Sequence, residues 1–129
     1  MPHLVFEFSA NLERDGDIPG LLRKANDALI AQDGVFPIGG IRSRAIKLDY
    51  YRMADGAADY AFVHATLKIG AGRDQATKQR VGDALFEVMK SHFAAVYEKR
   101  YLALSLELGE FSEAGTWKHN NVHARFKRS

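Results

Sequence analysis

The second residue of the chain, Pro2, combines a residue type and a position that could support chemistry. Removal of Met1 would expose its nitrogen as a secondary amine, directly ahead of an apolar segment. Reference α-amino groups titrate at about 7.7 to 8.0, and burial or nearby cations lower that value. Such an amine suits a general base near neutral pH. Two readings stay open, because Pro2 could also be a tolerated residue ahead of a strand, and a retained Met1 would make its nitrogen a non-basic amide.

Three arginines are candidates for binding an anion. Arg73 ends the glycine-rich run IGAGR just before a predicted helix. The helix dipole disfavours a cation there, so an anion nearby would explain the residue. Arg42 and Arg44 share one face of a predicted strand, and guanidinium groups suit carboxylates. The alternatives are a solvated arginine in a glycine-rich corner and two charges that protect the edge of a sheet.

The five histidines give little support for a metal site. His119 and His123 have the spacing of ligands on a helix, but the asparagines between them favour a turn and no third ligand is evident. His64 and His92 fall in predicted secondary structure, where we expect them at the edge of the core or in solvent. The role of His3, beside the candidate base, stays open.

The composition limits the class of protein. The chain has 129 residues, a net charge of +2, 47% hydrophobic and 26% charged residues, which fits one globular domain and gives little basis for nucleic-acid binding. The absence of cysteine excludes disulfides, thiolate nucleophiles and iron–sulfur clusters. No apolar run approaches the about 20 residues that span a bilayer, and no basic segment precedes the first apolar stretch. We therefore expect a cytoplasmic protein without a membrane partner.

Hydrophobic periodicity places the candidate residues in two similar units. In the first unit, residues 3–9 alternate apolar and polar side chains as a strand does. Asp17 is a predicted N-cap of an amphipathic helix that continues toward Gly34. Residues 41–51 alternate again and predict a second strand. The first unit is therefore strand, helix, strand.

The second unit repeats this order after a loop at residues 53–59. Residues 60–69 alternate as a half-buried strand. Asp74 is a predicted cap of the next helix, whose apolar stripe continues to Val96. Residues 102–108 alternate as a fourth strand. The sequence thus contains a weak internal repeat of two βαβ units.

The two units, at about residues 2–51 and 60–110, predict a single domain over residues 1–129 with a C-terminal extension. Strands joined through a crossover helix run parallel with a right-handed connection, so both helices should cover one face of a four-stranded sheet. The opposite face would then expose Phe, Ile and Leu side chains. Another copy of the chain is the simplest cover, so we expect a homo-oligomer.

Three segments carry a resemblance to a known family. They are FPIGGIRSR at residues 36–44, RMADGAADYAFVHATLKIGAGR at 52–73 and NNVHARFK at 120–127. With Pro2 and the doubled βαβ pattern, they resemble the tautomerase superfamily and, within it, the 5-carboxymethyl-2-hydroxymuconate Delta-isomerase family. The resemblance covers nearly the whole chain.

The resemblance implies a tandem βαβ tautomerase fold of the α/β (α+β) class, with a four-stranded mixed sheet and two helices on one face. It also implies a homotrimer with pockets at subunit boundaries and an isomerase that needs no metal or organic cofactor. Its substrate would be a polycarboxylate dienol from homoprotocatechuate (4-hydroxyphenylacetate) degradation. A processed Pro2 would be the catalytic base, and Arg42, Arg73 and Arg44 would bind the substrate.

Two alternatives to this function stay open at the level of the sequence. One is another activity of the superfamily, such as 2-hydroxymuconate or phenylpyruvate tautomerase, because the proline and the cations are shared. The other is a ligand-binding or assembly module without catalysis. The chemical state of the amino terminus distinguishes catalysis from binding, and an assay distinguishes the substrates.

Overall fold

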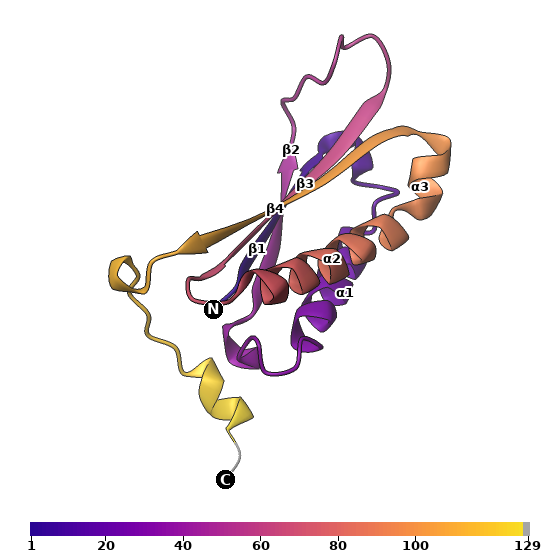
Figure 1. Ribbon diagram of the computed structural model, residues 1–129. Helices are drawn as coiled ribbons and strands as arrows, with labels where there is room; N and C mark the ends of the chain where they lie inside the picture. The colour runs from indigo at the N-terminus through magenta and orange to yellow at the C-terminus, as the bar shows by residue number, and fades with distance from the viewer. Residues whose placement is uncertain (128–129) are drawn as a thin grey trace.

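A four-stranded sheet lies at the centre of the fold, with its strands in the order β2-β1-β3-β4 (Figure 1). The computed structural model describes residues 1–127. The strands are β1 (His3–Ser9), β2 (Arg42–Leu48), β3 (Tyr60–Gly70) and β4 (Tyr101–Phe111). β1 pairs parallel with β2 and β3 pairs parallel with β4, whereas β1 and β3 are antiparallel. The predicted mixed sheet of two βαβ units is confirmed.

Two long helices cover one face of the sheet, as predicted (Figure 1). α1 (Ile18–Ile30) connects β1 to β2, and α2 (Gln75–His92) lies between β3 and β4. Both start at the predicted caps, because the carboxylates of Asp17 and Asp74 accept hydrogen bonds from first-turn N–H groups at 3.2 and 2.8 Å. These bonds satisfy donors that a helix start leaves without partners. Within residues 1–127 no helix is long and apolar enough to cross a membrane.

The second helix is shorter than its apolar stripe predicts. α2 ends at His92, and a short third helix, α3 (Ala94–Lys99), follows Phe93, whose backbone departs from helical values at φ −96° and ψ 11°. The prediction of one helix through Val96 was wrong, because Phe93 and Val96 continue the helical spacing across the break. Phe93 is fully buried, so the chain changes direction there without exposing its apolar side.

β2 is also shorter than the predicted strand over residues 41–51. It ends at Leu48, which pairs in register with Ser9, the last residue of β1. Since β1 ends at Ser9, the residues after Leu48 have no neighbouring strand with which to form backbone hydrogen bonds. The length of the neighbouring strand, rather than the local pattern, therefore sets this boundary.

The core lies between the sheet and the two long helices. Large and small side chains face each other across neighbouring strands, as where Phe6 of β1 pairs in register with Ala65 of β3. Burial of a large apolar side chain contributes about 1.5–3 kcal/mol. This packing holds in place the end of the sheet at which β1 and β2 begin. Fully buried residues of the strands and long helices include Leu4, Phe6, Leu21, Ala25, Ala61, Val63, Ala65, Leu67 and Met89.

The opposite face of the sheet carries no helix within the described residues (Figure 1). It is more polar than we expected, since Glu7, His64 and Ser105 lie in one row across β1, β3 and β4. The Nδ1 atom of His64 is 2.7 Å from the Oγ atom of Ser105. Ile46 of β2 is 46% exposed, but strand alternation directs most of the Phe and Leu side chains toward the helices.

The cap of α1 makes a prediction about Gly20. An added Cβ there would collide with the carboxylate of Asp17. Alanine ordinarily stabilises a helix by up to about 1 kcal/mol relative to glycine. Because displacing the cap typically costs about 1 kcal/mol, the two terms offset each other, and we expect Gly20→Ala to leave the free energy of unfolding within about 0.5 kcal/mol of its original value.

The same substitution should raise the free energy of unfolding in an Asp17→Ala background, where there is no carboxylate to displace. Chemical denaturation of the four proteins at one protein concentration measures both effects. An equal change in the two backgrounds would contradict the role assigned to Asp17.

Candidate active site

Pro2 lies where β1 begins, and its ring is buried. Its carbonyl oxygen accepts a hydrogen bond from the backbone N–H of Arg42 at 3.3 Å, which joins the starts of β1 and β2. β1 is an inner strand, so strand pairing on both sides holds this part of the chain. Met1 precedes it and is half-buried. An amine created by removal of Met1 would therefore be held in place by the sheet.

The amino terminus lies among cations. Burial lowers the pKa of the Met1 amine below its ordinary value of 8.0, and the charges of Lys118, Arg73 and Arg42 lower it further. The carboxylate of Glu113 acts in the opposite direction. Each cation raises the free energy of the ammonium form, so the site favours a neutral amine.

Arg42 and Arg44 share one side of the edge strand β2, as the alternation predicts, and both are exposed. The Nη2 atom of Arg42 is 4.0 Å from the Sδ atom of Met1, so this guanidinium faces the position ahead of Pro2. Arg44 lies farther along the strand, with its Nη1 atom 3.4 Å from Nδ1 of His3. Burial and the charges of both arginines lower the pKa of His3. Arg42 is therefore the arginine of this strand that contacts the chain terminus.

Arg73 makes structural contacts that its sequence position does not reveal. Its guanidinium donates hydrogen bonds to the carbonyl oxygens of Gly70 at 3.1 Å and Val35 at 2.8 Å, and lies 5.0 Å from the centroid of the Phe36 ring. These carbonyl oxygens and the ring offset the unfavourable helix dipole, so Arg73 has a stabilising local role that the dipole argument did not predict. Its charge still lowers the pKa of the terminal amine, so Arg73 acts electrostatically on the amino terminus.

The C-terminal segment, residues 112–127, contributes to the site although we had assigned it no role. The Nδ2 atom of Asn120 donates to the carbonyl oxygen of Gly39 at 3.1 Å and lies 3.9 Å from the Sδ atom of Met1. Its Oδ1 atom accepts from the backbone N–H of Val122 at 2.7 Å, which confirms the turn predicted by the asparagines. One side chain thus fixes this segment to the loop before β2.

Lys118 and Glu113 of the same segment form an ion pair, with Nζ and Oε2 3.0 Å apart. The charge of Lys118 lowers the pKa of the Glu113 carboxyl, as do the terminal amine and Arg73 to a smaller extent. No motif in the sequence singled out either residue. Asn120 is the first residue of the segment NNVHARFK, which resembles a known family. That resemblance did not indicate a role for Asn120.

A cavity of about 620 Å³ opens beside the amino terminus. Met1, Arg42 and Lys118 line it. Ligand pockets commonly have volumes of about 300–1,000 Å³, so this one has the size for a small molecule. A neutral amine beside guanidinium and ammonium groups can take a proton from an anionic ligand. The lining also includes Gly39, Ile41, Trp117, His119, Asn120 and Val122.

The other histidines do not build a metal centre in the part of the chain that the structure describes. No three His, Cys, Asp or Glu side chains among those residues are grouped to hold an ion. His123 lies in a 3-10 turn and His119 precedes it in an irregular stretch, so the two do not share an α-helix. His92 is the last residue of α2, and its Nε2 atom is 2.7 Å from the carbonyl oxygen of Gly16.

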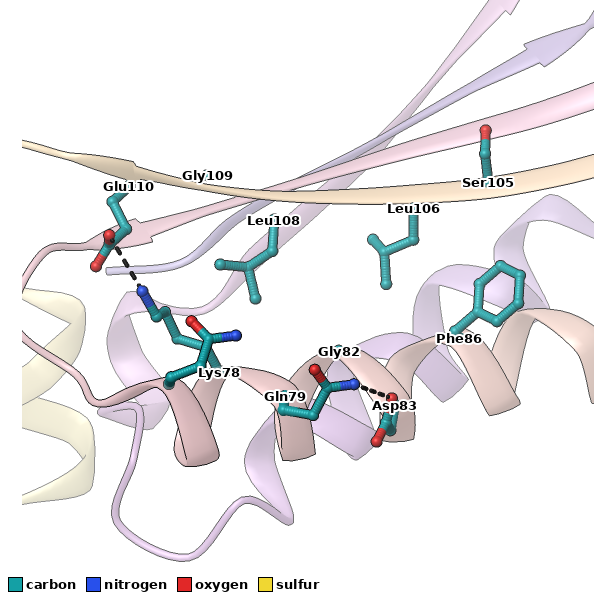
Figure 2. Close-up of a pocket in the computed structure, with 11 residues that line it drawn as sticks. Lys78, Gln79, Gly82, Asp83, Phe86, Ser105, Leu106, Leu108, Gly109 and Glu110 are labelled. Atoms are coloured by element: carbon teal, nitrogen blue, oxygen red, sulfur yellow. Dashed lines mark hydrogen bonds and ion pairs between the residues drawn. The ribbon is translucent and has the colours of Figure 1, made fainter.

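A second groove lies between α2 and β4 (Figure 2). Figure 2 shows Leu106, Leu108 and Phe86 pointing into it, with the ion pair of Lys78 and Glu110, 3.4 Å apart, at one end. Its volume is about 600 Å³, but none of the residues predicted for the site lines it. The cavity at the amino terminus is therefore the candidate active site.

The fold is that of the tautomerase superfamily. A fused 4-OT, solved as a symmetric trimer, has a TM-score of 0.68 to this structure over 91% of this chain and 93% of that one. The two are 15% identical, so this likeness shows the fold alone.

Closer relatives show the family. A family model described as 5-carboxymethyl-2-hydroxymuconate isomerase matches residues 2–126. A curated 5-carboxymethyl-2-hydroxymuconate Delta-isomerase from Escherichia coli is 52% identical over 127 residues, which are 98% of this chain and 100% of that protein. The crystal structure of a 5-carboxymethyl-2-hydroxymuconate isomerase from Deinococcus radiodurans R1 has a TM-score of 0.94 at 52% identity, over 98% and 95% of the two chains. The chain belongs to the 5-carboxymethyl-2-hydroxymuconate isomerase family, as its motifs predict.

The contact of the C-terminal segment with Gly39 makes a prediction. An added Cβ there would lie 2.8 Å from the backbone N and Cα atoms of His123, so the segment would have to move. Because overpacking costs about 1–3 kcal/mol, we expect Gly39→Ala to speed tryptic cleavage after Lys118 and Arg125 roughly tenfold. Gly82→Ala is the control, since an added Cβ there meets nothing within 4 Å. Equal cleavage rates in both variants would argue against this docking.

Proposed function

We propose that the protein isomerises 5-carboxymethyl-2-hydroxymuconate to its 2-oxo-3-ene isomer, with Pro2 as the group that carries the proton. The observation on which this depends is the family match over residues 2–126, which starts at that proline. The curated relative from Escherichia coli is named for the same isomerisation. The cation-lined cavity at the amino terminus supports an anionic substrate.

The proposed reaction moves one proton and changes no oxidation state overall. The neutral amine of Pro2 takes the proton from the 2-hydroxyl group of the dienol. The electron pair of that O–H bond forms the 2-oxo group, and the conjugated double bonds shift. The prolinium then returns the proton to a carbon farther along the conjugated system. The base is regenerated, and in this proposal one proton-carrying group completes the cycle without a metal or organic cofactor.

The arginines would stabilise the charge that develops during this transfer. As the hydroxyl proton leaves, negative charge spreads over the 2-oxo oxygen and the adjacent carboxylate. Donors that are already fixed at this position lower the energy of the transition state more than that of the ground state. The contact of Arg42 with Met1 and the hydrogen bonds that fix the guanidinium of Arg73 support this proposed role. Arg44, which lies beside His3, is the third candidate for binding substrate.

We further propose a homotrimer. The fused 4-OT with the same fold was solved as a symmetric trimer, and one face of the sheet here is free of helices within residues 1–127. The substrate is a small polycarboxylate, which does not cross bilayers unaided because burying its charges is costly. This favours a cytoplasmic enzyme of homoprotocatechuate degradation, the pathway that the substrate's chemistry implies.

Removal of Met1 should switch the activity on. While Met1 is present, the nitrogen of Pro2 is an amide without a basic lone pair, and Met1 lines the cavity. We expect protein that retains Met1 to convert the dienol at the uncatalysed rate. Treatment of that sample with methionine aminopeptidase should then produce activity in proportion to the loss of Met1. Intact mass and the ultraviolet absorbance of the dienol measure the two quantities.

The control is the same protein labelled at the processed terminus with a reactive α-keto halide, which should be inactive. Full activity in the labelled sample, or in a sample that retains Met1, would show that Pro2 is not the base while leaving the family assignment unchanged.

The dependence of kcat/KM on pH should follow the terminal amine. A base acts in its neutral form, so kcat/KM should rise with pH through the amine pKa and then level off. Burial and cations lower the pKa of the Met1 amine. The same cations should act on the Pro2 amine, one residue further along, so the plateau should begin at a lower pH than for a Pro2 amine in an unfolded peptide. Lys118→Met should move the rising limb to higher pH, and Glu113→Gln should move it to lower pH.

Initial rates between about pH 5 and 9 in buffers of constant ionic strength provide this measurement. Lys78→Met is the matched control, because its ion pair with Glu110 lies in the other groove. A rising limb that neither variant moves would contradict the electrostatic coupling between the C-terminal segment and the amine.

A further inference from the structure

The side chain of Met1 marks space that a ligand would occupy in the processed protein. Its Sδ atom lies 4.0 Å from Nη2 of Arg42 and 3.9 Å from Nδ2 of Asn120. Its amine lies close enough to Lys118 that this charge lowers the amine pKa more than either arginine does. Loss of Met1 would leave these groups lining the cavity. A ligand entering that space would therefore meet a guanidinium, an amide and the ammonium of Lys118.

Lys118 is also able to exchange its partner. Its Nζ atom pairs with Glu113 at 3.0 Å, but its side chain is 36% exposed and that of the glutamate 57% exposed. Exposed ion pairs contribute about 0–1 kcal/mol, so this pair is easily broken. The backbone of the segment is fixed nearby, because Asn120 donates to the carbonyl oxygen of Gly39. A flexible ammonium on a fixed backbone can leave the glutamate for a substrate carboxylate.

The proposed substrate carries three negative charges, so a third cation in the site would complement it. Muconate has two carboxylates, and the 5-carboxymethyl group adds a third. Arg42 and Arg73 are the two arginines whose charges act on the terminal amine, whereas Arg44 lies beside His3. Two guanidinium nitrogens of Arg73 are already engaged by backbone carbonyls. Lys118 is the further cation that lines the cavity with Arg42.

We propose that Lys118 binds the carboxymethyl carboxylate of the substrate, and that Glu113 holds its ammonium group until the substrate enters. This inference rests on the proposed function, because it assigns a residue to the third carboxylate of that substrate. It makes Lys118 the residue that selects a tricarboxylate over 2-hydroxymuconate, the dienol without the carboxymethyl arm. Glu113 then competes with the substrate for Lys118.

The test compares Lys118→Met, Lys118→Arg and Glu113→Gln with the unaltered enzyme, at a pH on the kcat/KM plateau of each. A charge-assisted hydrogen bond is lost in Lys118→Met, so KM for the tricarboxylate should rise by about tenfold or more. KM for 2-hydroxymuconate should change less than about twofold, and its inhibition constant replaces KM where turnover is slow. Lys118→Arg should retain most of the selectivity.

Glu113→Gln distinguishes a role of Lys118 in substrate binding from a purely structural role of its ion pair with Glu113. If Glu113 competes for Lys118, removing its charge should lower KM for the tricarboxylate, opposite to the effect of Lys118→Met. If the pair only stabilises the segment, both variants should raise KM for both substrates. Lys78→Met, which breaks an ion pair in the other groove, should leave both constants unchanged. Equal losses for the two substrates, or shifts of the same sign in the two variants, would overturn the proposal.

A binding experiment distinguishes this inference from the proposed function. Calorimetric titration of the processed protein with propane-1,2,3-tricarboxylate and with glutarate compares three carboxylates with two, without turnover. If Lys118→Met weakens binding of the tricarboxylate but not of glutarate, the role of Lys118 is supported, whether or not the protein isomerises the dienol. Failure of the unaltered protein to isomerise the dienol would reject the proposed function instead. Unchanged tricarboxylate binding in Lys118→Met would reject the role of Lys118 even in an active isomerase.

Discussion

An ammonium ion is disfavoured at the start of β1, and this electrostatic effect governs how the site works. Burial and the charges of Lys118, Arg73 and Arg42 all lower the pKa of the terminal amine. The same cations attract a polycarboxylate, so one set of charges keeps the base neutral and binds the substrate. Glu113 moderates both effects, because it raises the amine pKa and occupies Lys118. The proposed reaction needs both properties at once, since a neutral base must lie beside an anion.

The fold assembles this cluster from distant parts of the sequence. The inner position of β1 holds the amino terminus, and the parallel edge strand β2 brings Arg42 to it through a backbone hydrogen bond from Arg42 to Pro2. Contacts with the carbonyls of Gly70 and Val35 fix Arg73 where β3 ends. Residues of the C-terminal segment line the cavity beside Arg42. Rigid elements thus hold the arginines, whereas Lys118 extends from a segment without regular structure, which suits a group that exchanges partners.

The sequence predicted those features that depend on local pattern. Alternation predicted the strands and that Arg42 and Arg44 share one side of β2, and Asp17 and Asp74 predicted the starts of the helices. Phe93 was missed as a break because it preserves the apolar spacing. The role of Lys118 could not be predicted, since residues 112–127 carry no periodic pattern and their path depends on contacts such as that of Asn120 with Gly39, 81 positions away. Arg73 was assigned to the site by family resemblance, but its bonds to backbone carbonyls required coordinates.

A ¹⁵N NMR titration of the Pro2 nitrogen in protein that has lost Met1 tests this electrostatic effect most directly, because it reports the protonation of that atom without turnover. The cations that lower the pKa of the Met1 amine predict a single titration of the Pro2 amine, with a midpoint below that of the same amine in an unfolded peptide. High salt should move the midpoint upward by screening these charges. A midpoint equal to or above that of the unfolded peptide in an active preparation, insensitive to salt, would contradict it.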